Sequence, residues 1–159
     1  MKGKTIGYYK NVQNVGYCVA DADVNVGMGV ILNRAEKTAK LPASEDEAKK
    51  CHRIVSNINV NPEMHNFADT LTIKKGEYVR ADDLLTVINM EMEFADYEVT
   101  DGVESLNAGD KLVFAETTGL LKKSEAVTDY TVYFEVIEKT AYMGKGILAV
   151  VRAGALATE

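Results

Sequence analysis

The chain has 159 residues, with 24 acidic and 18 basic side chains and a formal net charge of −6. This charge argues against binding to a nucleic-acid backbone, because such binding needs clustered Lys and Arg. Hydrophobic residues make up 47% of the sequence and only two prolines occur, so we expect a folded domain rather than a disordered chain. The opening residues lack the apolar region of a secretory signal, and no run of about 18 apolar residues is present, so we expect a protein that is made in a cytoplasm and has no membrane partner.

Residues 1–23 are predicted to form an extended N-terminal arm, with short strands at 6–9 and 15–19. Tyr8, Tyr9 and Tyr17 lie in this arm, where a monomer has little core in which to bury them. Tyrosine combines apolar area with a hydroxyl group and is common at interfaces. Two interpretations stay open: the arm contacts a partner through these tyrosines, or it folds back over its own domain.

A seven-residue phrase, apolar-x-x-Gly-x-x-apolar, occurs three times. A glycine in the middle of the phrase adopts positive φ at little cost, so the chain can turn sharply and then enter a strand. We therefore interpret Gly27, Gly76 and Gly109, in the copies at 24–30, 73–79 and 106–112, as structural turns.

Residues 24–152 are predicted to form a single β domain of about nine to eleven short strands, because turn signals separate short segments rich in apolar, β-branched and aromatic residues. In the segment 89–100 apolar and polar residues alternate, and the alternation changes phase after Ala95, which predicts a β-bulge or corner there. Strands are expected at 28–32, 37–41, 52–60, 70–73, 77–80, 111–115, 120–123, 130–139 and 146–152.

One short helix is predicted near 44–50, where Ser44 can cap the first turn, acidic residues follow it and two lysines close the last turn. Residues 153–159 form a C-terminal tail rich in small side chains. The predicted fold is thus mainly β: an antiparallel β-barrel or sandwich with one short helix.

Catalytic and metal-binding patterns are weak in this chain. The only histidines are His52 and His65, and no serine lies in a nucleophile-elbow context. Cys18 and Cys51 lack the further ligands that a metal site needs and are expected in the core. Residues 21–27 resemble a calcium loop, but the glycine is one place late and the closing glutamate is absent.

The carboxylates of the predicted strands are interpreted as solvent-facing residues rather than as a catalytic pair. They alternate with apolar positions, and the chain has no Trp for a sugar platform. We therefore predict no enzyme activity, no cofactor and no metal site. The carboxylates concerned are Asp82, Asp83, Glu91, Glu93, Asp96 and Glu98.

Short motifs follow one another along the chain at residues 29–32, 40–43, 54–55, 73–79, 106–112, 118–121, 134–138 and 147–151. Their order resembles that of the head-decoration, or auxiliary capsid, proteins of tailed bacteriophages. Residues 130–133 depart from that family, whose members often have a Gly-rich phrase before the penultimate strand.

This resemblance implies a non-enzymatic virion component that decorates the outer surface of the capsid as a homo-oligomer and binds the major capsid protein. Tyr8, Tyr9 and Tyr17 are then the expected contact residues. Two alternatives stay open: another phage structural component, such as a head-fibre base or a tail-tube protein, and a small-molecule-binding or enzymatic β-barrel.

Overall fold

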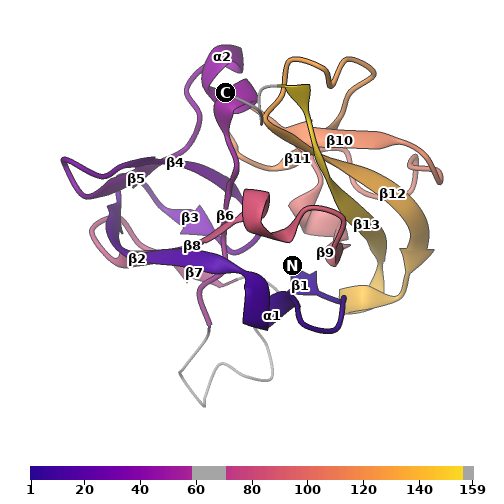
Figure 1. The fold of residues 1–159 in the computed structure, drawn as a ribbon, viewed down its shortest axis with the longest axis horizontal. Coiled ribbons are helices and arrows are strands. Elements are labelled where there is room, and N and C mark those ends of the chain that lie inside the picture. Colours follow the sequence, from indigo (N-terminus) through magenta and orange to yellow (C-terminus); the bar gives the residue numbers. More distant parts are fainter. Residues whose placement is uncertain (59–70, 156–159) are drawn as a thin grey trace.

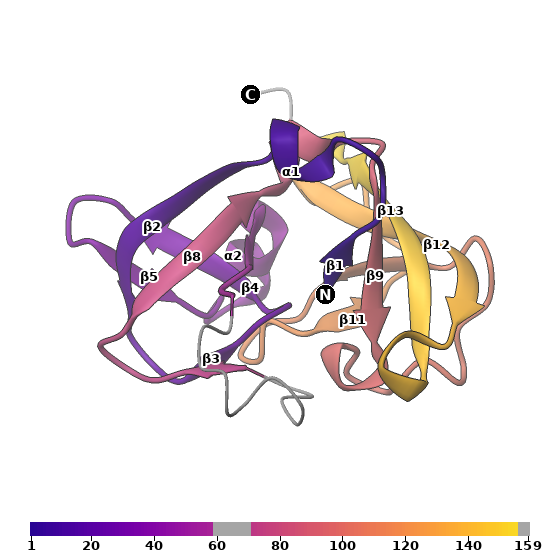
Figure 2. The same ribbon diagram turned by 90° about the horizontal axis from the view of Figure 1, so that it is seen from below.

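The computed structural model describes residues 1–58 and 71–155, and these form a mainly β structure with two units lying side by side (Figure 1). One unit is a closed five-stranded barrel, and the other is an open six-stranded sheet. Seen from below, the barrel and the sheet lie at opposite ends of the molecule (Figure 2). The predicted mainly β fold is confirmed, and both a barrel and a second sheet are present.

The barrel has the strand order β2-β5-β4-β6-β8 and is antiparallel apart from one parallel pair, β2 with β5. Small side chains fill its interior, including Cys18, Ala39 and Ala81. The strands are β2 (Gln13–Ala20), β4 (Gly29–Asn33), β5 (Thr38–Lys40), β6 (Arg53–Val55) and β8 (Tyr78–Asp83), with the short pair β3 (Val24–Asn25) and β7 (Thr72–Ile73) beside them.

The six-stranded sheet is antiparallel and has the order β1-β9-β13-β12-β10-β11. Its predicted β-rich segments form strands because alternating side chains pack into the main core, where Phe94, Phe114 and Phe134 make edge-to-face contacts. The strands are β1 (Lys2–Gly3), β9 (Glu91–Ala95), β10 (Lys111–Phe114), β11 (Leu121–Lys123), β12 (Val132–Thr140) and β13 (Gly146–Ala153).

The largest hydrophobic core lies between the two units rather than inside either one. In β6, Ile54 packs into this shared core while its neighbour Val55 packs inside the barrel, since successive strand residues point to opposite faces. This explains why both Ile54 and Val55 are apolar.

The predicted helix is present as α2 (Glu45–Lys50), and the Ser44 hydroxyl accepts a hydrogen bond from the backbone N–H of Glu47 at 3.3 Å. The predicted corner also occurs: β9 ends at Ala95 and the chain enters the 3-10 helix Asp96–Glu98. Two further 3-10 helices, Leu84–Val87 and Tyr142–Gly144, were not predicted.

The predicted arm of residues 1–23 is tied into the body of the molecule. Strand β1 pairs with β9 of the sheet, and β2 is a strand of the barrel. The strand predicted at 6–9 is wrong, because this segment turns at Gly7 (φ 92°) into the one-turn helix α1 (Tyr8–Asn11). The ring of Tyr8 lies against Gly3, where an added Cβ would overlap it. The arm therefore folds back over its own domain, as one of the two interpretations expected.

Candidate functional site

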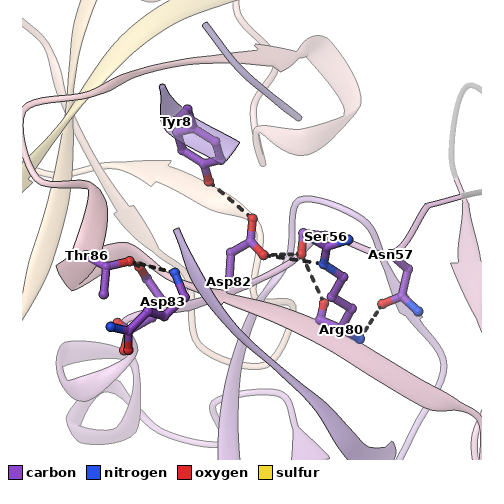
Figure 3. A network of polar contacts seen from close by, with 8 residues as sticks. Tyr8, Ser56, Asn57, Arg80, Asp82, Asp83 and Thr86 are labelled. Carbon is purple, nitrogen blue, oxygen red and sulfur yellow. Dashed lines mark hydrogen bonds and ion pairs between the residues drawn. The ribbon is translucent and has the colours of Figure 1, made fainter. Parts of the chain in front are cut away.

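The candidate site lies on the outer face of β8, where α1 covers one end of the strand. Tyr78, Arg80 and Asp82 alternate with Val79 and Ala81, which are buried inside the barrel. The three outward residues therefore line one face in sequence, from an exposed end at Tyr78 to a buried end at Asp82. Figure 3 shows Tyr8 directed at Asp82.

Asp82 is the centre of a buried polar network. Its side chain is 1% exposed and accepts hydrogen bonds from the Ser56 hydroxyl at 2.6 Å and from the Tyr8 hydroxyl at 3.4 Å (Figure 3). The guanidinium Nε of Arg80 lies 3.8 Å from the same carboxylate, within ion-pair range but beyond hydrogen-bond distance. This Nε is buried and has no hydrogen-bond partner among residues 1–58 and 71–155.

Burial dominates the electrostatics of this network. It raises the pKa of the Asp82 carboxyl, and the Ser56 hydrogen bond and the Arg80 charge counteract that rise. Burial, followed by the Asp82 charge, also raises the pKa of Tyr8, so its hydroxyl keeps its proton and remains a donor. The network is thus arranged to satisfy a buried carboxylate.

The side chain of Asn57 completes the edge of β8. Its amide donates to the backbone carbonyl of Tyr78 at 2.9 Å and its carbonyl accepts from the backbone N–H of Arg80 at 2.7 Å. The Ser56 backbone N–H donates to the Arg80 carbonyl at 2.8 Å, so this edge of β8 faces β6, and the Asn57 side chain bonds there where the regular pairing of the two strands has ended. It fixes Tyr78 and Arg80 in position.

A hollow of about 240 Å³ opens beside the network, and its lining combines polar residues of the network with apolar side chains. Tyr9 (66% exposed) and Ile58 (68% exposed) line it together with Arg80. Tyr78 (68% exposed) is two residues before Arg80 on the same face, and Tyr17 (45% exposed) lies opposite Arg80 at a bulge of β2. We call this surface, made of Tyr9, Tyr17, Ile58, Tyr78 and Arg80, the β8 face.

The three tyrosines predicted as contact residues therefore separate into two kinds. Tyr8 is buried and holds Asp82, so its ring is not on the surface, whereas Tyr9 and Tyr17 both lie on the β8 face. Tyr9 packs edge-to-face on Tyr8, with ring centroids 5.1 Å apart. Contact with a partner stays a prediction for these residues.

The other predicted residues take structural places. Gly27, Gly76 and Gly109 have φ of 92°, 86° and 88°, in the region that favours glycine at turns. Cys18 and Cys51 are buried and unpaired, as expected of core residues. His65 lies outside the described residues.

Several carboxylates expected to face solvent are buried instead. Asp82 and Asp83 both lie inside the structure, and Asp83 pairs with Arg53, its cross-strand neighbour, at 2.6 Å. Glu98 is buried beside Gly27, where it accepts from the backbone N–H of Ala95 at 2.7 Å and pairs with the amine of Met1. Glu93 is covered by β1.

One sequence signal could have revealed part of this. Asp82 and Asp83 are adjacent and lie just after the strand predicted at 77–80. If that strand continues through them, as β8 does, their side chains point to opposite faces and cannot both face the same solvent. Ser56 and Arg80, by contrast, carry no comparable signal, because they become functional neighbours only when β6 and β8 pair.

In the described ranges, 1–58 and 71–155, no group of three or more His, Cys, Asp or Glu residues is placed to hold a metal ion. Among the same residues, no helix is long and apolar enough to cross a membrane. No protein-family model matches the chain, and no curated protein or solved structure shows significant similarity to it.

Proposed function

We propose that this protein is a non-enzymatic structural component of a tailed-phage virion, which decorates the capsid shell by binding the major capsid protein through the β8 face. The observation that carries the proposal is the grouping of four large, exposed apolar side chains around the half-exposed Arg80. Tyrosine and arginine are the residues that most often dominate the binding energy of protein interfaces.

The β8 face is held rigidly before any partner binds. Tyr17 and Tyr78 stand on paired strands, Asn57 holds the backbone of β8, and Tyr9 rests on the buried ring of Tyr8. A rigid surface loses little conformational entropy on association, so more of the contact energy appears as affinity. When many copies bind one shell, modest contacts of this kind add up.

A small-molecule-binding barrel receives less support. The interior of the barrel is filled by the side chains of its own described strands, including Cys18, Val30 and Val79, so a ligand would have to bind on the outer surface. The alternative of a tail-tube component shares the β-rich fold, and the oligomeric state distinguishes it, since a tube protein stacks into rings.

The test is co-sedimentation of the purified protein with capsids of the phage whose genome encodes it. We expect Tyr9→Ala and Tyr78→Ala each to weaken binding about 30-fold, the equivalent of about 2 kcal/mol for a central interface residue. Ile137→Ala is the matched control, because Ile137 is an exposed apolar residue on β12 of the sheet, away from the barrel (Figure 2).

Three outcomes would count against the proposal. Failure of the wild-type protein to co-sediment would refute the decorating role, and stacked rings in solution would favour the tail. If Ile137→Ala weakens binding and the tyrosine variants do not, the protein binds shells through the sheet and the β8 face is not the contact surface.

A further inference from the structure

A second hollow, of about 330 Å³, lies on the other side of the barrel strands from the β8 network and has a different character. It is formed where β4 runs on beyond its last pairing with β6, Val30 opposite Arg53, and where the chain returns from α2 to β6. Its lining combines an aliphatic floor with basic side chains, and we call it the β4–β6 pocket. Its lining includes Ile31, Leu32, Arg34, Lys50, His52 and Arg53.

The lining of this pocket is basic, whereas the whole chain has a formal net charge of −6. Arg34 and Lys50 have no ion-pair partner among residues 1–58 and 71–155. Of the eleven salt bridges that those residues form, one, Arg53–Asp83, lies at the pocket. Two uncompensated cations at the mouth of one hollow create a local positive potential that favours an anion.

The other two basic residues of the lining, Arg53 and His52, are each held in one orientation by a neighbouring group. Asp83 holds the Arg53 guanidinium at 2.6 Å, so Arg53 is a fixed part of the wall and its charge is already compensated. Nδ1 of His52 lies 3.0 Å from the backbone carbonyl of Lys50. Because a carbonyl only accepts hydrogen bonds, Nδ1 donates in this contact, so in the neutral ring Nε2 is an acceptor and offers no proton to a carboxylate.

The aliphatic part of the lining favours a ligand that has an apolar part as well as a charge. Leu32 is a half-buried aliphatic side chain on the face of β4 that belongs to the barrel core, whereas Ile31 packs on the opposite face, against the shared core. Covering Leu32 releases water from apolar surface. The volume is at the lower end of the range typical of small-ligand sites, roughly 300–1,000 Å³. A bare inorganic ion would leave the aliphatic floor uncovered.

The geometry points to the β4–β6 pocket as a binding site for a small organic anion, a carboxylate carried on a short aliphatic body. The carboxylate would lie between Arg34 and Lys50, and the aliphatic body would cover Leu32. This inference is independent of the capsid role, since the pocket and the β8 face share none of the residues that line them.

The probe is octanoate, titrated into the isotopically labelled full chain and followed by amide chemical shifts in NMR. We expect saturable shifts at Ile31, Leu32 and His52, and at least a ten-fold loss of affinity in Arg34→Gln and in Lys50→Gln. Both side chains are exposed, so these variants should fold, and an unchanged unfolding midpoint verifies it. Lys75→Gln, an exposed lysine on the turn before β8, is the matched control.

Two further titrations define the ligand class. Octanol tests the floor without the charge, and inorganic phosphate tests the charge without the aliphatic body; both should bind at least ten-fold more weakly than octanoate. Equal binding of octanol or of phosphate would overturn the assigned class. Absence of shifts at the pocket with octanoate, or equal losses in Lys75→Gln and Lys50→Gln, would overturn the site itself.

Discussion

The three glycines of the repeated phrase offer a matched test, because they share a backbone conformation but differ in their surroundings. Their φ angles are 92°, 86° and 88° at Gly27, Gly76 and Gly109. A Cβ added at Gly76 or Gly109 would meet no atom within 4 Å. At Gly27 it would lie 2.8 Å from Cδ of Glu98 and closer still to Oε1, so Glu98 would have to move.

The cost of each Gly→Ala change follows from these surroundings. A left-handed conformation costs an L-residue about 1–2 kcal/mol, partly offset by the lower entropy of the unfolded chain. We therefore expect Gly76→Ala and Gly109→Ala to lower the free energy of unfolding by about 1 kcal/mol. Gly27→Ala also displaces a buried carboxylate from the Met1 amine and the Ala95 N–H, and breaking a buried pair costs about 3–5 kcal/mol.

The assay is urea unfolding, with thermal unfolding alongside. For a chain of this size, 1 kcal/mol corresponds to a Tm change of about 2–4 °C, so Gly27→Ala should lower Tm by about 10–20 °C and the other two variants by about 2–4 °C. A Glu98→Ala background supplies the control: there, Gly27→Ala should cost no more than Gly76→Ala does. Equal losses in all three single variants would refute the steric argument.

Two further predictions concern buried titratable groups. Burial raises the pKa of the Asp82 carboxyl above the value of about 3.9 that it has in the unfolded chain. As the pH falls from 7 to 4, the folded protein therefore takes up a proton before the unfolded chain does. The free energy of unfolding of the wild type should accordingly rise relative to that of Asp82→Asn over this range. Urea unfolding of both proteins across that range measures it, and a difference independent of pH would contradict it. Both cysteines are buried, and burial raises the pKa of the Cys51 thiol to about 12, so Ellman's reagent should react slowly with native protein at pH 8 and rapidly with both thiols in urea. Rapid reaction of the native protein would show that the core opens.

The strands, the helix and the turns that were predicted correctly are specified by residues within or beside each element. Strand β10 was expected after the third repeated phrase, β12 from its β-branched and aromatic residues, and β13 from its run of apolar residues. The helix α2 was expected from its capping serine, first-turn acids and closing lysines. Each of these signals lies within a few residues of the element that it specifies. The turn glycines belong to the same class, since positive φ is a local requirement.

The N-terminal segment and the buried acids could not be predicted in this way. Lys2 and Gly3 pair with Glu93 and Met92, about ninety positions away, and nothing near residue 2 specifies that partner. Glu98 has the sequence context of a solvent-facing strand residue, yet it lies in a 3-10 helix beside Gly27. The candidate site shares this origin, because Tyr8, Ser56 and Asp82 meet only after the barrel has closed.

The shared core has a consequence for how the protein unfolds. The interior of the barrel contains mostly Ala, Cys and Val, whereas the largest buried side chains, among them Phe94, Phe134 and Ile54, lie between the barrel and the sheet. Small side chains bury little apolar area, so the barrel depends on the shared core for stability. Both units should therefore unfold in a single transition.

Ile54→Ala tests this dependence, because Ile54 belongs to a barrel strand but packs into the shared core. The substitution should lower the free energy of unfolding by about 2–5 kcal/mol. Amide signals of Val79 in the barrel and Val151 in the sheet, followed by NMR through a urea titration, should disappear at one common midpoint in the wild type and at one lower midpoint in the variant. A midpoint that falls for Val79 alone would mean that the sheet is stable without the barrel, and that the two units are separate domains rather than one cooperative structure.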